Sequence, residues 1–228
     1  MKKYAIIVAG GIGTRMESEI PKQFLLLQQK PILQHTLEQF ANTSSNPIII
    51  LVLPANQFDY WLQLCQQYAC KVAHTLVKGG ETRSKSVMNA LATIEDYDNE
   101  DSLVAIHDGV RPLVSTQLIE KSYEKAQKGI GAIACVLLKD SIRKTTGNEP
   151  LGAMNRAEYK LVQTPQTFSF LDIKHAYEVL SSLGEVNDTD DASVFERAGF
   201  EITIIEGDYK NIKITSPEDL KIATALLT

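Results

Sequence analysis

The sequence has few cysteines and no long apolar run. The three cysteines, Cys65, Cys70 and Cys135, form an odd number without metal-ligand spacing, which argues against a disulfide framework or a zinc site and favours ordinary buried thiols. No stretch approaches the roughly 18 apolar residues that a membrane helix needs. The apolar run in "MKKYAIIVAGG" is too short for a signal peptide. We therefore expect a cytoplasmic protein without a membrane partner.

The chain also lacks an excess of basic residues. Its formal net charge is −5 over 228 residues. Nucleic-acid binding draws on a basic face that releases counterions, and this balance does not indicate one. We expect no nucleic-acid partner, and any bound anion should meet a local basic cluster.

Short β-branched runs alternate with amphipathic segments along the chain. Apolar runs at 4–9, 48–53, 103–108, 131–138 and 201–206 predict strands, and segments 30–42, 57–69, 82–94 and 115–128 predict helices. Ser115 is a predicted N-cap, Gly129 a predicted helix end, and "SPEDL" (216–220) a predicted helix start. The alternation predicts an α/β fold with a mostly parallel sheet and helices on both faces.

The segment 139–168 interrupts this alternation. It has turn signals at 146–148 and 150–152 and no helical period, which predicts an extended excursion or a β-hairpin arm. A projecting hairpin has little core of its own, so packing against another subunit would stabilise it. We predict one domain over 1–228, with 139–160 as a dimerisation arm, and a surface loop is the alternative.

The stretch "VAGGIGTRMESEIPKQ" (8–23) has the composition of a phosphate-binding loop after a first strand. A dinucleotide-binding loop would place a small residue where Met16 stands, and a P-loop would need G-K-[ST] where Thr14 and Arg15 stand. Arg15 and Lys22 are the distinctive residues, because two cations beside a glycine turn can bind a polyphosphate. The alternative is that both are solvated surface residues.

Three further segments carry charged or polar residues that are candidates for ligand binding. "LVAIHDGVRPLV" places Asp108 at a strand end with Arg111 after it, where the acid can hold a metal or a hydroxyl or cap a helix. "GGETRSKSVMNAL" places a glycine pair before a helix that carries Arg83 and Ser86, a second anion or base pocket. Lys213 lies within a strand-like run and would need exposure or an anionic partner.

An acidic segment, "NDTDDASVFERAG" (187–199), is interpreted as the first turn of a helix, because acids favour that end of the helix dipole. His35, His74 and His175 have no partner spacing and are interpreted as structural.

The motifs together resemble those of a known family. In order they are "GGIGTRM", "PKQFLLL", "KPIL", "GGETRSKSV", "HDGVRPLV", "DSIRK", "QTPQTF", "TDDASVFE" and "NIKITSPEDL", over about residues 3–227. The set resembles the bacterial 2-C-methyl-D-erythritol 4-phosphate cytidylyltransferases. The ribitol-5-phosphate cytidylyltransferase family is similar in most of these motifs and stays open as the alternative.

The resemblance implies a Rossmann-like nucleotidyltransferase fold, a homodimer with interlocking arms, Mg²⁺, and transfer of CMP from CTP to a polyol phosphate. It implies that Arg15 and Lys22 stabilise transition-state charge and that Arg156 and Lys213 hold the attacking phosphate. The residues it implies for CTP are Ala9, Gly10, Gly11, Gly13, Gly80, Arg83 and Ser86. Those it implies for the acceptor are Asp108, Arg111, Ser141, Thr164 and Thr189, with Asp108 also close to the metal.

Two residues depart from the family pattern. Gly10 stands where alanine is more frequent, and Ser141 stands where threonine is usual. Both keep size and chemistry nearly unchanged, although the glycine favours the ribitol-phosphate alternative slightly. A nucleotide-binding regulator without turnover is a further alternative, but binding alone would not require both cationic clusters.

Overall fold

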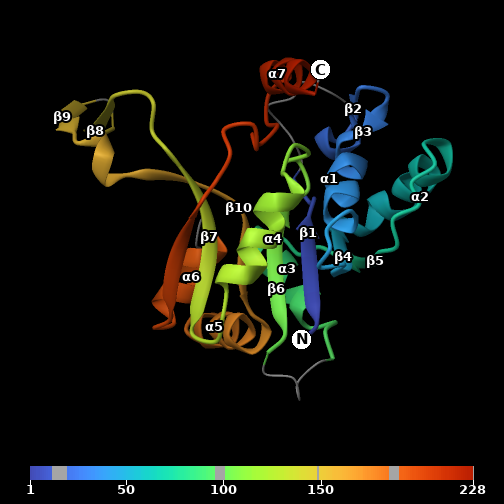
Figure 1. Cartoon of the computed structure of the whole chain (residues 1–228), viewed down its shortest axis with the longest axis horizontal. Helices are drawn as coiled ribbons and strands as arrows, with labels where there is room; N and C mark the ends of the chain where they lie inside the picture. The colour runs from blue at the N-terminus through green and yellow to red at the C-terminus, as the bar shows by residue number, and fades with distance from the viewer. Residues whose placement is uncertain (12–19, 96–100, 148, 185–189, 228) are drawn as a thin grey trace.

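A seven-stranded sheet organises the chain (Figure 1). The computed structural model describes residues 1–11, 20–95, 101–147, 149–184 and 190–227. The strand order is β11-β7-β10-β6-β1-β4-β5. All neighbours are parallel except β10, which is antiparallel to both β6 and β7. The strands are β1 (Lys3–Val8), β4 (Ile48–Leu53), β5 (Thr75–Lys78), β6 (Leu103–Asp108), β7 (Ile130–Leu137), β10 (Lys160–Ser169) and β11 (Glu201–Glu206).

Alternate residues of the central strands enter two separate cores, as the period of two in a strand requires. In β1, Tyr4 and Ile6 face the core that helices α3, α5 and α6 cover. Ala5 and Ile7 face the core of α1, α2 and α4. The sheet is therefore buried on both faces, which explains its nearly continuous apolar strands.

The helices begin where the sequence provides caps. Ser115 accepts a hydrogen bond from the Leu118 amide, and Ser216 with Asp219 forms a capping box ahead of Pro217. Both predicted helix starts are confirmed. The helices are α1 (Ile32–Ala41), α2 (Phe58–Gln67), α3 (Arg83–Leu91), α4 (Thr116–Lys125), α5 (Phe170–Ser182), α6 (Asp191–Arg197) and α7 (Pro217–Leu226).

Three local predictions were wrong. Helix α4 ends at Lys125, and Gly129, with φ +79°, lies in the turn that leads into β7. The segment around Lys213 forms no strand. The end of the predicted excursion is the central strand β10, whose residues Gln163–Ser169 are buried between β6 and β7.

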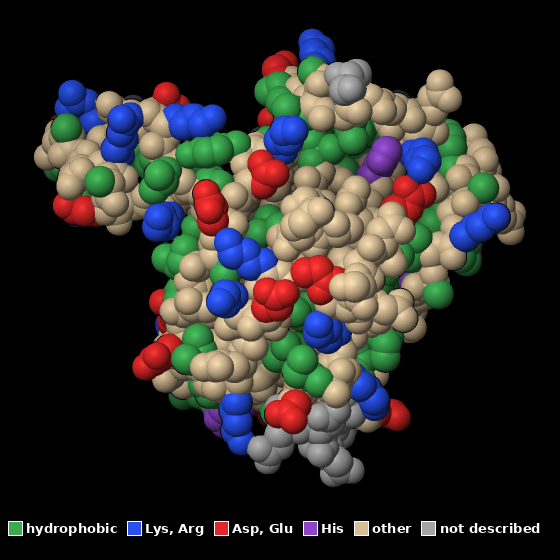
Figure 2. Space-filling view, viewed as in Figure 1, with side chains coloured by type: hydrophobic (Ala, Val, Ile, Leu, Met, Phe, Trp, Pro, Cys, Tyr) green, Lys and Arg blue, Asp and Glu red, His purple; other side chains and the backbone are tan. Residues whose placement is uncertain are grey.

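A hairpin arm projects from the sheet at β7 and β10 (Figure 1). Among the described residues, strands β8 (Ile142–Thr146) and β9 (Glu149–Met154) pair with each other and with no third strand, and a short 3₁₀ helix, η4 (Arg156–Glu158), follows them. The turn passes through Gly147 at φ +56°, and Asn148 lies outside the described residues. The predicted β-hairpin is confirmed, and Figure 2 shows that it carries cationic and apolar side chains, among them the exposed Leu151.

Within the described part of the chain, none of the helices has the length and apolar character needed to cross a bilayer.

Cys65 and Cys70 form a contacting pair at the end of α2, whereas Cys135 is buried in β7. The Cys70 amide donates to the Cys65 carbonyl at 2.9 Å. The hydrogen bond from the Cys65 thiol outweighs burial and lowers the pKa of Cys70 to about 7. Both thiols are only half-buried, so the prediction of ordinary buried thiols holds for Cys135 alone.

We expect Cys70 to react with iodoacetamide faster than Cys65 at pH 7. The thiolate is the nucleophile, so the rate should rise with pH through a midpoint near 7. Mass spectrometry of peptides alkylated between pH 5 and 9 measures this midpoint. Cys65→Ala removes the donor and should move the midpoint up towards about 8.5. An unchanged midpoint in that variant would contradict the assigned cause.

Candidate functional site

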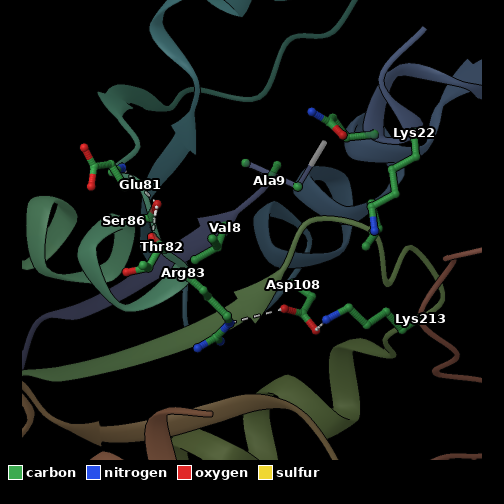
Figure 3. A pocket seen from close by; sticks show the side chains of 14 residues that line it. Val8, Ala9, Lys22, Glu81, Thr82, Arg83, Ser86, Asp108 and Lys213 are labelled. Carbon is green, nitrogen blue, oxygen red and sulfur yellow. Dashed lines mark hydrogen bonds and ion pairs between the residues drawn. The ribbon is translucent and has the colours of Figure 1, made fainter. Parts of the chain in front are cut away.

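Two adjoining cavities lie at the carboxyl ends of β1 and β6, the edge at which open α/β sheets bind ligands. The first has a volume of about 320 Å³, and its lining joins the end of β1, the Lys22 turn and the start of α3 (Figure 3). The second has a volume of about 240 Å³ and lies towards β10 and α6. Arg83, Asp108 and Lys213 line both cavities. The arrangement suits two anionic ligands that meet at one charged cluster.

Asp108 is the centre of that cluster. Its Oδ2 lies 3.0 Å from the Lys213 Nζ and 3.2 Å from the Arg111 Nε, and its Oδ1 lies 3.7 Å from the Arg83 Nε. Burial would raise the pKa of the Asp108 carboxyl, but Lys213, then Arg83 and Arg111, outweigh burial and hold that pKa well below its ordinary value. Asp108 is therefore an anion between three cations. Lys213 has the anionic partner that its position required.

A buried hydrogen-bond relay fixes the backbone at Asp108. The Arg111 carbonyl can only accept, so His107 Nε2 carries the proton and donates to it at 3.3 Å. His107 Nδ1 then accepts from the Thr164 hydroxyl at 3.0 Å, and that hydroxyl accepts from the Asp108 amide at 3.1 Å. Complete burial lowers the pKa of His107 to about 3, so the imidazole stays neutral. Thr164 thus retains one lone pair for a substrate.

Arg111 is anchored from a second side. Its Nη1 donates to the Asn211 carbonyl at 2.9 Å, while the Asn211 amide group donates to the Thr164 carbonyl at 2.8 Å. Asn211 is fully buried. The segment that carries Lys213 is thereby held against β10 without forming a strand.

The glycine pair before α3 forms a tight turn over the first cavity. The Ser86 hydroxyl accepts from the Gly80 amide at 3.0 Å and donates to the Thr82 carbonyl at 2.9 Å. Thr82 caps α3 by accepting from the Lys85 amide. The start of α3 thus offers a rigid polar wall with its helix dipole directed at the cavity.

If the first cavity binds CTP, as the sequence resemblance implies, Gly80→Ala should weaken that binding at least tenfold, because a Cβ on Gly80 would lie 2.4 Å from the Lys85 Cγ and 3.1 Å from its carbonyl carbon. The turn must shift and release the Ser86 bond. Isothermal titration with CTP measures the change. Gly147→Ala, at the tip of the arm, is the control: its φ of +56° is strained for alanine although a Cβ there has open space, so this variant strains a turn outside the first cavity and should leave CTP affinity unchanged. Wild-type affinity in Gly80→Ala would contradict the role of this turn.

Lys22 approaches the first cavity from the short helix η2 (Lys22–Phe24). Phe24 is buried and stacks on Trp61 of α2 with ring centroids 6.0 Å apart. Gln23 donates to Gln57 at 2.8 Å. The Lys22 Nζ lies 3.7 Å from the point that a Cβ on Gly11 would occupy, so the ammonium group lies beside the β1 loop.

The structure brings together most of the described residues that the sequence singled out. Ala9, Gly10, Gly11, Lys22, Gly80, Arg83, Ser86, Asp108 and Lys213 line the first cavity, and Arg111 and Thr164 line the second. Ser141 and Arg156 lie on the exposed arm and line neither described cavity of their own chain. Gly13, Arg15 and Thr189 lie outside the described residues.

The sequence reasoning missed Asp191 and Tyr177. Asp190 is the N-cap of α6 and Asp191 is in its first turn, as predicted. Asp191 is nevertheless fully buried, and it pairs with Arg83 at 2.6 Å and accepts from the Tyr177 hydroxyl at 2.6 Å. No spacing in the sequence links residues 83, 177 and 191.

Comparison with known proteins identifies close relatives over the whole chain. The sequence model described as "IspD: 2-C-methyl-D-erythritol 4-phosphate cytidylyltransferase" matches residues 4–228. The enzyme of that name from Azobacteroides pseudotrichonymphae is 48% identical over 99% of both chains, and that from Bacteroides thetaiotaomicron is 46% identical over 100% of both. The crystal structure of the Francisella tularensis enzyme superposes with a TM-score of 0.81 at 32% identity, covering 99% of each chain.

Proposed function

The chain belongs to the 2-C-methyl-D-erythritol 4-phosphate cytidylyltransferase family, and from this premise we propose how its two cavities divide the reaction. The activity is transfer of CMP from CTP to 2-C-methyl-D-erythritol 4-phosphate, which gives CDP-methylerythritol and pyrophosphate in the non-mevalonate isoprenoid pathway. We assign CTP to the cavity of Gly11, Lys22 and Gly80, and the acceptor to the cavity of Arg111 and Thr164. The observation that carries this assignment is that Arg83, Asp108 and Lys213 line both cavities.

Charge, rather than proton transfer, dominates the chemistry. A phosphate monoester has a second pKa near ~6, so the attacker is already largely dianionic at neutral pH and needs no general base. His107, the histidine beside the site, is neutral and has both ring nitrogens engaged. The protein must instead hold one anion in line with another.

Lys213 is suited to hold the attacking phosphate. Its side chain is 41% exposed and its Nζ already contacts an anion at 3.0 Å. When Lys213 turns to the phosphate, Arg111 and Arg83 still contact Asp108, so the negative charge of the carboxylate stays neutralised. Lys22, which lines the first cavity, would neutralise charge on the leaving pyrophosphate. The same role is proposed for Arg15, which lies outside the described residues.

Magnesium fits this site as a companion of the triphosphate. Among the described residues no three His, Cys, Asp or Glu side chains cluster, so these residues form no metal cage of their own. Mg²⁺ characteristically takes one or two carboxylates together with phosphate oxygens and waters. Asp108 is the carboxylate that both cavities share, and we propose it as the protein contact. The ion would supply positive charge at the phosphates.

We further propose that the arm completes the acceptor site of a second subunit. Arg156 is exposed and its guanidinium donates to the Lys139 carbonyl at the base of the arm. A two-stranded hairpin with no third strand has too little core for independent stability, so a partner surface is its natural support. A cytoplasmic location stays a prediction from the sequence.

Pyrophosphate release from CTP tests the acceptor. Purified protein with Mg²⁺ should release pyrophosphate rapidly with 2-C-methyl-D-erythritol 4-phosphate and far more slowly with ribitol 5-phosphate. Faster release with ribitol phosphate would assign the chain to the alternative, and CTP binding without release from either would indicate a regulator.

A further inference from the structure

Arg83, Asp108 and Lys213 form the wall between the two cavities. The position of Arg83 in this wall depends on a carboxylate that lines neither cavity. We propose that Asp191, together with Tyr177, is a positioning residue that fixes the Arg83 guanidinium between the nucleotide and the acceptor. The inference rests on the proposed division of the two cavities and extends it to a buried carboxylate and phenol.

Arg83 bridges two carboxylates. Its Nη2 donates to the Asp191 Oδ2 at 2.6 Å, while its Nε lies 3.7 Å from the Asp108 Oδ1. The contact with Asp191 is therefore the short, charge-assisted one. Figure 3 shows Arg83 extending from the start of α3 to the Asp108–Lys213 pair at the base of the cavity.

Asp191 is held in turn from the protein interior. Its side chain is 0% exposed, and its Oδ1 accepts from the buried Tyr177 hydroxyl of α5 at 2.6 Å. The amide of the next residue, Ala192, donates to the Gln166 side chain of β10 at 2.9 Å. Helix α6 is thus docked on the sheet at the point where Asp191 meets Arg83.

The energetics favour a functional reason for this pair. Burial would lower the pKa of the Arg83 guanidinium, but the Asp191 carboxylate outweighs burial and the pKa lies above its ordinary value. A buried ion pair is seldom more stable than apolar residues of the same volume, so it adds little to folding by itself. The Asp191 contact instead fixes the Arg83 guanidinium. Without this contact the guanidinium would be free to pair with Asp108, where it would compete with Lys213.

The test compares Asp191→Asn, Arg83→Gln and the double variant by pyrophosphate release and thermal unfolding. Asp191→Asn keeps an oxygen for Tyr177 but frees Arg83, and we expect kcat to fall about 10²-fold. The double variant removes the fully buried carboxylate together with the half-buried guanidinium that it holds, so its Tm should exceed that of Asp191→Asn while its kcat stays as low as that of Arg83→Gln. Asp172→Asn, on a carboxylate that accepts from the Gly129 amide outside both cavities, should turn over like wild type.

Two outcomes would overturn the proposal. One is a wild-type kcat in folded Asp191→Asn, and the other is recovery of activity together with Tm in the double variant, which would show a packing role alone. If Asp191→Asn does not fold, Tyr177→Phe decides between the two roles, because it removes the donor to the Asp191 Oδ1 and keeps both charges. A lower kcat with little change in Tm is expected from positioning, and a wild-type kcat would overturn it. Absence of turnover in wild type and Asp172→Asn alike would instead reject the proposed function.

Discussion

Lys22→Ala should lower kcat at least 10²-fold, equivalent to about 3 kcal/mol, with little change in CTP affinity. Negative charge grows on the leaving pyrophosphate as the bond to the α-phosphate breaks, so a cation placed there stabilises the transition state more than bound CTP. The structure fixes the position of Lys22 well. Pro21 precedes η2, and Phe24 anchors it against Trp61, while the Lys22 Nζ lies beside Gly11.

Single-turnover pyrophosphate release and CTP titration separate the two quantities for Lys22→Ala. Lys30→Ala is the matched control, because Lys30 lies in the short strand β3 (Lys30–Pro31) and pairs with Glu38 at 2.8 Å instead of lining the first cavity. Lys22→Arg keeps the charge and should recover part of the rate. A near-wild-type kcat in Lys22→Ala would remove Lys22 from the mechanism.

The parts of this fold that the sequence predicts are those with local causes. The strands at 48–53, 103–108 and 201–206 coincide with the observed ones, because a strand buried on both faces must be continuously apolar. Ser115 and Ser216 begin helices because the serine side-chain oxygen accepts a hydrogen bond from the backbone amide three residues later. This amide has no partner within the helix, so the cause is local.

The failures share a different cause, namely tertiary contacts. Strand β10 carries polar residues such as Gln163, Gln166 and Thr167, yet all three are buried, because their side chains bond to other buried groups. Their composition resembles a loop, and only the neighbours β6 and β7 make the segment a strand.

The same distinction applies to the site. Asp108 and Arg83 are visible as charged residues at expected element ends and Lys213 as a cation within a strand-like run, and the resemblance to a known family assigns them roles. The contact between Asp191 and Arg83 cannot be predicted from the sequence. An acid in the first turn of a helix is already explained by the helix dipole, so Asp191 gives no sign of a second partner. Only the burial of Asp191 shows that the local explanation is incomplete.

Mixing two inactive variants should restore activity if the arm acts on the partner subunit. Arg156→Ala removes one cation from the exposed arm, and Lys213→Ala removes one of the three cations beside Asp108. Each variant alone lacks one of the two cations that we assign to the attacking phosphate, so each should lose at least 10²-fold in kcat/KM for the acceptor. Lys213→Ala should still fold, because Arg111 and Arg83 continue to compensate the buried Asp108.

In a mixed dimer with arms acting in trans, one site receives an intact Arg156 from its partner and keeps its own Lys213, while the other site has lost both. Random exchange makes about half of the dimers mixed, so activity should recover to about one quarter of wild type. A cis arrangement leaves every site with one cation missing, and the mixture stays as inactive as its components. Refolding both variants together, with differently tagged chains to confirm exchange, distinguishes the two. Because Arg156 lines neither described cavity of its own chain, recovery is the result that the geometry favours.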